Sequence, residues 1–348
     1  MSLLVRAPRA WFGAGAVDDA AVLLHDGVVS FAGRRRDAPR AGEGAAPEEL
    51  WVDGFLMPAV ADRHVHIRLS DAAAVLFGGV AAVRDLAWIP DEIFALAEAS
   101  ELPSFNGPLV RAAGPMLTGL GGYPTRAEWA PALAARELHG PEDAANVVRL
   151  LAERGAAVIK VSLNAEEGPT PTDAELVAVV DTAHGLGLPV TAHTQGSGQV
   201  ERGLGAGIDE LAHCPWTERL GEDVIEALAD RVRIVSTLDI WSFGEITEEL
   251  RIAADNLTRF RNAGGTVVYG TDLGNGAVPP GIDVREAFLL HEACRMPVED
   301  VLTAMVAGSL RPGAPGDLVG LAADPFDGLA ALGDLRLVMR VGRIIRRT

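Results

Sequence analysis

The sequence predicts an α/β fold, a (β/α)8 TIM barrel with a small flanking β-sandwich built from both chain ends. From about residue 58, short apolar runs alternate with amphipathic stretches of helical length, which is typical of a parallel sheet with crossover helices. About eight such runs favour closure into a barrel. Both chain ends instead contain short strand-like runs and turns, and neither end alone has enough strands for a stable sheet. We therefore expect the barrel at residues 58–311 and the β-sandwich at residues 1–57 and 312–348.

The elements of the predicted barrel follow in order along the chain. An apolar run that begins at Phe55 leads into His64-Val-His66 and predicts the first strand. The capping box Thr172-x-x-Glu175 predicts the start of a helix that ends near Gly185 or Gly187. The other expected strands of the barrel cover residues 80–85, 156–162, 188–193, 208–213, 232–237 and 265–272, and further helices are expected at 91–100 and 141–155.

His64 and His66 stand two residues apart at the end of the first expected strand. Because side chains alternate between the two faces of a strand, both imidazoles point to the same side. The strands of such a barrel end at one mouth, where active sites lie. Four further candidates lie near the ends of later expected strands, namely Lys160, His193, His213 and Asp272. We therefore expect these six side chains to meet at the mouth.

The nitrogen and oxygen donors of these side chains suit zinc or a similar divalent ion. Taken singly, His193 or His213 could be a hydrogen-bonded core imidazole. Lys160 lies inside the apolar run 158–161 and could form a buried salt bridge. Alternatively, burial and nearby cations lower the pKa of Lys160. Its neutral amine could then take up carbon dioxide, and the resulting carbamate could bridge two metal ions.

At these residues the chain resembles the amidohydrolase superfamily over nearly its whole length. The motif Pro58-x-x-x-Asp62-x-His64-x-His66 is similar to that of the first strand in this family. Further matching segments are 79–86, 159–160, 192–193, 210–213, 270–272 and the tail 316–325. The stretch 183–193 most resembles the prolidase-like and imidazolonepropionase-like branch.

The resemblance implies a distorted barrel with a binuclear metal centre, for which zinc is the first expectation. The implied ligands are His64, His66 and Asp272 for the inner ion, His193 and His213 for the outer ion, and a carboxylated Lys160 for both. It also implies a hydroxide that bridges the ions and attacks the substrate carbonyl, which the outer ion polarises. Asp272 would be the catalytic residue that accepts the hydroxide proton and returns it to the leaving nitrogen.

Four residues near the expected mouth are candidates for substrate binding. Arg68 would share the face of His66 if the strand runs on, and a similar arginine in the dihydroorotase pattern binds a carboxylate, although Arg68 could equally form a loop salt bridge. Tyr123 stands where prolidase-like members tend to have histidine, and its phenol could hydrogen-bond a carbonyl oxygen. Trp216 and Trp241 follow the sixth and seventh expected strands and could line the mouth or pack on the surface.

The leading functional expectation is a metal-dependent hydrolase of a carbon–nitrogen bond in a small substrate, such as an N-acyl amino acid or a dipeptide. The alternative is a hydrolase of a cyclic amide, an imide or a lactone, with a dihydroorotase-like use of Arg68. A mononuclear deaminase usually carries a glutamate shortly after the fifth-strand histidine, whereas His193 is followed by Thr194-Gln-Gly196. A barrel that has lost its metals is the non-enzymatic alternative, and the complete set of candidate ligands argues against it.

Composition limits the partners and the location. The formal net charge of −18 argues against binding to nucleic acid or an anionic membrane. The expected partners are a small-molecule substrate and, as an oligomer, further copies of the chain. Cys214 and Cys294 form no C-x-x-C motif, and the apolar run at the N-terminus is too short for a signal peptide or a membrane span. We therefore expect a cytoplasmic protein.

Overall fold

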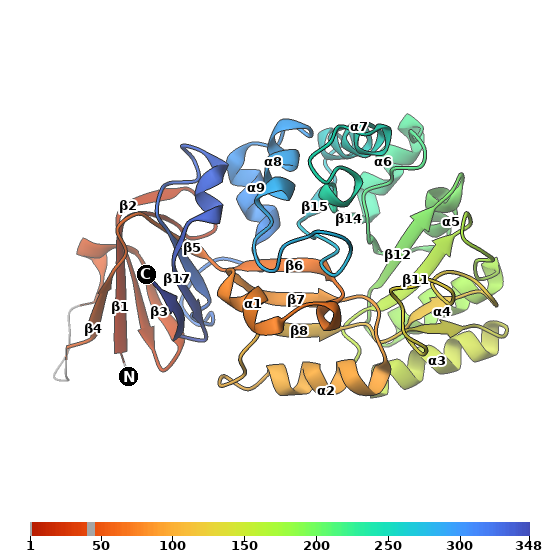
Figure 1. The fold of residues 1–348 in the computed structure, drawn as a ribbon, viewed down its shortest axis with the longest axis horizontal. Helices are drawn as coiled ribbons and strands as arrows, with labels where there is room; N and C mark the ends of the chain where they lie inside the picture. Colours follow the sequence, from red (N-terminus) through yellow and green to blue (C-terminus); the bar gives the residue numbers. More distant parts are fainter. Residues whose placement is uncertain (1, 40–45) are drawn as a thin grey trace.

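The computed structural model describes residues 2–39 and 46–348, and it consists of a barrel beside a curved sheet (Figure 1). The barrel strands are β6 (Val60–Val65), β7 (Val80–Asp85), β8 (Leu109–Ala112), β11 (Ile159–Asn164), β12 (Val190–Gln195), β13 (Glu210–Leu211), β14 (Arg233–Val235) and β15 (Thr266–Val268). The helices are α1 (Ala72–Phe77), α2 (Pro90–Ser100), α3 (Pro141–Glu153), α4 (Asp173–Gly185), α5 (Gln199–Ala206), α6 (Glu222–Arg231), α7 (Glu248–Asn262), α8 (Val284–Glu292) and α9 (Val298–Met305). The predicted fold class is confirmed.

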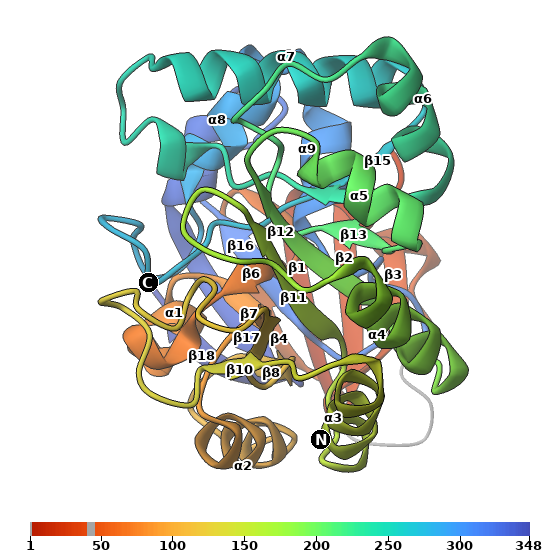
Figure 2. The ribbon, with the colours of Figure 1, turned by 90° about the vertical axis from the view of Figure 1, so that its right-hand side faces the viewer.

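The barrel is distorted because two separate parallel sheets build it. Strands β6, β7 and β8 form one sheet, and β11 to β15 form the other, with β9 (Met116–Thr118) and β10 (Ala135–Glu137) at its edge. Backbone hydrogen bonds join the sheets at two seams. At one seam the amide of Asp272 donates to the carbonyl of His64 (2.8 Å), and at the other the amide of Ala157 donates to Ala112 (2.9 Å). Helices α3 to α7 surround the larger sheet (Figure 2).

Both chain ends contribute to the curved sheet, which runs in the order β18-β17-β16-β5-β1-β2-β3, with β4 also paired to β1. Its strands are β1 (Ser2–Trp11), β2 (Ala16–His25), β3 (Val28–Arg34), β4 (Glu48–Trp51), β5 (Phe55–Pro58), β16 (Leu318–Leu321), β17 (Leu335–Arg340) and β18 (Arg343–Arg347). The first and last strands enclose a hydrophobic cluster of their own that includes Val22, Leu318 and Met339. The predicted sandwich therefore takes the form of one continuous sheet that curls over this cluster.

Local sequence explains several element boundaries. The predicted capping box is present, since Glu175 N donates to Thr172 Oγ1 (3.3 Å) and Thr172 N donates to Glu175 Oε2 (2.7 Å) at the start of α4. All six residues of β11 are buried, as expected for a strand covered on both faces. The expected strand at 265–272 is shorter than predicted and ends at Val268. The chain beyond it bends to the seam, where Asp272 takes a left-handed φ of 56°.

A second hydrophobic cluster, much the larger one, fills the barrel and the space beneath its helices, with Val161, Ile234 and Leu257 among its fully buried members. Its position leaves the polar residues that follow the strands grouped at one end of the barrel. Among the described helices, none combines the length and apolarity that a membrane span requires.

Candidate metal centre

His64, His66 and Asp272 meet at the seam between the two barrel sheets. His64 lies in β6, His66 follows its end, and Asp272 lies in the segment after β15. The Nε2 atoms of both histidines are 3.2 Å from Asp272 Oδ1. One ligand atom from each of the three buried residues lies within 4.8 Å of the others, so this group could hold a metal ion.

The other three candidate ligands reach the same place from β11, β12 and the segment after β13. The ring centroid of His213 is 4.4 Å from that of His64 and 4.8 Å from that of His193. Lys160 Nζ is buried without a hydrogen-bond partner among the described residues, and its charge acts on all four histidines. The structure thus brings the four histidines and Asp272 together, and it buries the sixth predicted ligand, Lys160, in the neighbouring strand β11.

Hydrogen bonds orient three of the four imidazoles through Nδ1. His64 Nδ1 lies 2.7 Å from the carbonyl oxygen of Ala212, and His66 Nδ1 lies 3.3 Å from that of Ala87. A carbonyl oxygen only accepts, so each of these Nδ1 atoms carries the proton and each Nε2 is a free lone pair. His213 Nδ1 lies 3.0 Å from Thr237 Oγ1. Such contacts to the second nitrogen are typical of metal-binding histidines.

His193 is oriented the other way. Its Nε2 lies 3.3 Å from Gln195 Oε1, which leaves Nδ1 for a ligand. The Gln195 amide is itself held by two further contacts, since its Oε1 accepts from Asn164 Nδ2 (2.8 Å) and its Nε2 donates to Glu166 Oε2 (2.8 Å). The side chain of Gln195 therefore fixes the ring orientation of His193.

Burial keeps most of these groups neutral at neutral pH. It lowers the pKa of His193 to about 3, with the charge of Lys160 as the second cause, and it lowers the pKa values of His64 and His213 well below 6.5. Burial also lowers the pKa of Lys160 from 10.5 to about 7, against the opposing charge of Asp272. For His66, burial is outweighed by the close negative carboxylate of Asp272, so its pKa is raised. Neutral imidazoles and a neutral amine are the forms that bind metals and react with carbon dioxide.

Asp62 holds the seam beneath the ligands. Its Oδ1 accepts from the amides of His64 (3.0 Å) and Thr271 (3.1 Å), and its Oδ2 accepts from Thr271 Oγ1 (2.5 Å). The carboxylate therefore ties β6 to the segment that carries Asp272. The motif placed Asp62 near the ligands, and these contacts supply a structural reason for an acid at that position.

The expectation that the strand runs on past His66 is wrong. Strand β6 ends at Val65, and Ile67–Leu69 forms a 3-10 turn because the amide of Ile67 donates to the buried carboxylate of Asp85 (2.8 Å). Arg68 therefore does not share the face of His66 through strand alternation. Its half-exposed guanidinium lies 3.3 Å from Glu92 Oε2. A role in binding a substrate carboxylate stays a prediction.

The other three candidates for substrate binding lie beside the histidines. The ring of Tyr123 stacks on His193, with centroids 5.1 Å apart, and burial raises the pKa of its phenol. Trp216 meets His193 and His213 edge-on at 5.7 and 5.5 Å. Trp241 stacks on Trp216 at 3.9 Å. Whether these side chains contact a substrate stays a prediction.

Sequence reasoning missed Trp129, Thr237 and Gln195. The ring of Trp129 lies 4.4 Å from that of His66, and its Nε1 donates to Tyr123 Oη (3.1 Å). Trp129 belongs to the irregular segment between β9 and β10, where no periodicity predicts a direction. Its only sequence signal is that it follows Tyr123 by six residues.

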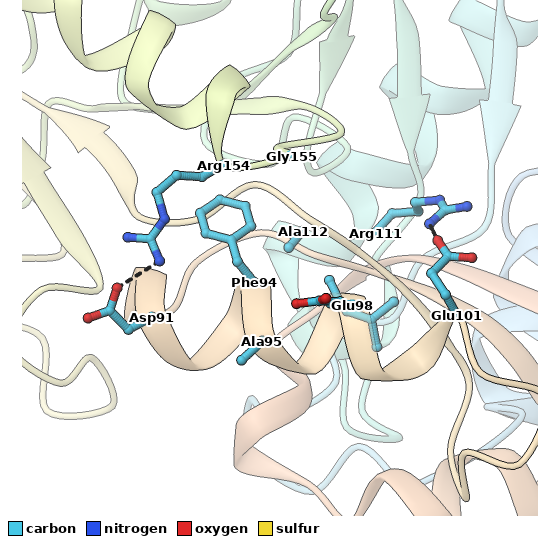
Figure 3. Close-up of a pocket in the computed structure, with 11 residues that line it drawn as sticks. Asp91, Phe94, Ala95, Glu98, Glu101, Arg111, Ala112, Arg154 and Gly155 are labelled. Carbon is cyan, nitrogen blue, oxygen red and sulfur yellow. Dashed lines mark hydrogen bonds and ion pairs between the residues drawn. The ribbon is translucent and has the colours of Figure 1, made fainter.

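A groove lies along α2, and none of the six candidate ligands lines it. This groove of about 550 Å³ is lined by residues of α2, β8 and the end of α3 (Figure 3). Four of its charged residues form two ion pairs, Arg154 with Asp91 at 2.7 Å and Arg111 with Glu101. None of the described residues that line the groove is a histidine or a cysteine. The candidate metal centre is therefore the group at the barrel mouth.

Solved structures share this fold over the whole chain. An amidohydrolase structure matches at 19% identity, covering 100% of both chains, with a TM-score of 0.84. Ochratoxinase from A. niger matches at 20% identity over 99% of this chain and 96% of its own, with a TM-score of 0.83. A Xaa-Pro dipeptidase with bound methionine matches at 18% identity over 99% of each chain, with a TM-score of 0.81. No family model and no curated protein sequence matches the chain. The chain therefore has the fold of these hydrolase structures.

Proposed function

We propose that the chain is a metal-dependent hydrolase of the amidohydrolase superfamily, in its prolidase-like branch, and that it cleaves a carbon–nitrogen bond of an N-acyl amino acid or a dipeptide. The observation that carries the proposal is the buried group His64, His66 and Asp272, which could hold a metal ion, with the rings of His193 and His213 beside it. Lys160, buried in β11, is the sixth proposed ligand. The structural likeness to a dipeptidase with bound methionine supports a substrate of amino-acid type.

Two buried polar atoms support a metal in this group. Among the described residues, Lys160 Nζ and Asp272 Oδ1 are buried without a hydrogen-bond partner, although two histidine Nε2 atoms lie 3.2 Å from Asp272 Oδ1. Buried polar atoms without partners are rare in folded proteins. A cation would satisfy both the carboxylate and the free imidazole lone pairs. The donor set suits zinc among other divalent ions.

Lys160 would complete the centre as a carbamate. Its neutral amine adds to carbon dioxide, which forms a nitrogen–carbon bond and releases one proton. The product carries a carboxylate at the end of the buried side chain, where the amine has no hydrogen-bond partner within residues 2–39 and 46–348. His64, His66 and Asp272 would hold one ion, and His193 and His213 the other, with the carbamate between them.

Two bound divalent ions would supply a water activated near neutral pH and a polarised carbonyl oxygen. The Asp272 carboxylate would take a proton from the attacking water and pass it to the leaving nitrogen. Tyr123 accepts a hydrogen bond from Trp129, so its own hydroxyl proton remains for a substrate oxygen. The raised pKa of the phenol keeps that proton in place at neutral pH.

Metal analysis together with a substrate screen tests the proposal. We expect about two divalent ions per chain, and release of amine from N-acyl amino acids, dipeptides or small cyclic amides. Turnover confined to cyclic amides, imides or lactones would favour the alternative specificity. One ion together with ammonia release from an aromatic amine would indicate a deaminase, and protein that neither binds ions nor turns over any amide would contradict the proposal.

Asp272→Asn tests the proton transfer. An amide cannot exchange the proton, so we expect kcat to fall at least about 10²–10⁴-fold while one or more ions stay bound. Metal content and kcat are measured on the same preparation. Near-normal turnover by the variant on a good substrate would exclude Asp272 as the acid–base residue.

A further inference from the structure

Aromatic side chains are concentrated around the candidate metal centre. The chain has six tryptophans and two tyrosines, and three of these tryptophans and one of these tyrosines make ring contacts with His66, His193 or His213. We propose that these mouth aromatics, Tyr123, Trp129, Trp216 and Trp241, bind a flat unsaturated ring of the substrate close to the bond that is cleaved. The inference rests on the proposed function and narrows the substrate class.

The first aromatic pair lies in the segment between β9 and β10. Trp129 packs over His66 and Tyr123 stacks over His193, so the pair reaches ligands of both proposed ions. The hydrogen bond from Trp129 Nε1 to Tyr123 Oη (3.1 Å) joins the two rings. Both side chains are only partly buried. They are therefore ordered surfaces at the centre rather than residues of the packed core.

The second aromatic pair is Trp216, which follows β13, and Trp241, which follows β14. In the sheet, strands β11 and β12 lie between β9 and these two strands. Trp216 is 4% exposed and supports Trp241, whose ring lies parallel to it at an interplanar angle of 20°. The ring of Trp241 is 6.2 Å from that of His213 and is partly exposed. Its Nε1 atom is buried and has no hydrogen-bond partner in the part of the chain that the structure describes. An indole N–H can only donate, so this atom calls for an acceptor from outside the described residues.

The charges around the pairs favour a neutral ring. Indole and phenol faces attract flat unsaturated groups through offset-stacked and edge-to-face contacts. The neutral donors beside the histidines are the Tyr123 hydroxyl and the Trp241 indole N–H, and the second of these is buried. Arg68 carries its charge outward to Glu92. The preferred occupant is therefore a flat neutral ring next to a carbonyl oxygen that can accept from one of these donors.

A matched pair of probes tests this preference without turnover. Benzyl methyl ketone and cyclohexylmethyl methyl ketone share a carbonyl and differ in ring planarity, and neither can be hydrolysed. The cyclohexyl ring buries at least as much apolar area, so the hydrophobic effect alone would not favour phenyl. We expect the phenyl ketone to bind about 2–10-fold more tightly, as measured by tryptophan fluorescence and ligand-detected NMR. Equal affinities for the native protein overturn the inference.

Variants assign the preference to particular rings. Trp129→Leu and Trp241→Leu should each reduce the ratio of the two affinities, whereas Trp51→Leu, on the half-exposed Trp51 of β4, should leave it unchanged. Trp241→Phe keeps a ring and removes the N–H, so both ketones should bind more weakly by a similar factor. If the leucine variants do not fold, a phenyl preference that survives Trp129→Phe still supports stacking. An undiminished ratio in folded leucine variants contradicts it.

The outcome is separable from that of the proposed function. The ketones are also titrated against protein stripped of metal by a chelator, where stacking should still favour phenyl. Metal binding and amide hydrolysis without phenyl preference would leave the proposed function standing and remove this inference. If the protein prefers the phenyl ketone but holds no ions and hydrolyses no amide, the aromatic binding site is supported and the proposed function is contradicted.

Discussion

Glu286 should make the protein less stable as the pH rises. This residue of α8 is fully buried, and its Oε2 accepts a hydrogen bond from the amide of Asp239 (2.7 Å). The pKa of its carboxyl is raised from 4.5 to about 8. Burial is the main cause, and the charge of Asp283 acts in the same direction, whereas hydrogen bonds from Ser236 and two backbone amides act in the opposite direction. The neighbouring Asp239 is itself paired with Arg285 (2.8 Å).

The direction of the effect follows from where the proton is bound. Above pH 4.5 an unfolded chain has released the Glu286 proton, whereas the folded chain keeps it until about pH 8. Unfolding between these values therefore releases a proton, and stability falls as the pH rises through that window. The loss is absent below pH 4.5 and complete above pH 8. From pH 6 to pH 9 it amounts to about 2–3 kcal/mol at 1.36 kcal/mol per pKa unit.

The test is thermal unfolding of native protein and Glu286→Gln from pH 5 to pH 9. Glutamine keeps an acceptor for the Asp239 amide and has no proton to lose, so its Tm should exceed the native value at high pH. For 348 residues, an unfolding entropy of about 2.1 cal/mol/K per residue converts the difference into roughly 3–4 °C. Glu292→Gln, at an exposed position of the same helix, is the control for net charge. Parallel Tm curves for the native protein and Glu286→Gln would refute the reasoning.

Three further predictions concern the metal centre. Lys160→Ala should abolish turnover and recover part of it when a short-chain carboxylic acid occupies the vacated position; activity without the acid would contradict a bridging carbamate. Thr237→Val removes the partner of His213 Nδ1 and should weaken retention of the second ion about 10–100-fold in chelator competition. For a substrate with a carboxylate, Arg68→Met should lower kcat/KM roughly tenfold to a hundredfold, which corresponds to a loss of about 1.5–3 kcal/mol of transition-state stabilisation. The neutral amide of that substrate should be unaffected, and equal handling of acid and amide by the native protein would leave Arg68 as the partner of Glu92 only.

The periodicity of the expected strands predicted the positions of the candidate ligands that lie within strands. His64, Lys160 and His193 lie in strands of the structure, and alternation within a strand has only two outcomes, so a correct strand fixes the face. The fold class followed from the same alternation of strand and helix. The seams were not predictable, because they depend on backbone pairing between segments far apart in the sequence.

The mouth was less predictable because irregular backbone has no period. Arg68 was expected on a continuing strand, yet a single buried carboxylate, Asp85, turns the chain one residue after His66. Trp129 and Gln195 act through contacts with Tyr123 and His193, and such contacts leave no pattern in a single sequence. Loop residues commonly determine specificity, so the substrate is harder to infer than the chemistry.

The shared sheet at the chain ends has a consequence for biosynthesis. Strand β5 pairs with β16. The backbone hydrogen bonds between these two strands can therefore form only after β16 has been synthesised and has left the ribosome. At about 5–20 residues per second, the intervening chain takes tens of seconds to synthesise. During that interval one edge of β5 offers unpaired backbone groups, which other nascent chains can match. The pairing that joins the two ends therefore raises the contact order of the chain, and we expect this sheet to be completed only after the last strands have been synthesised.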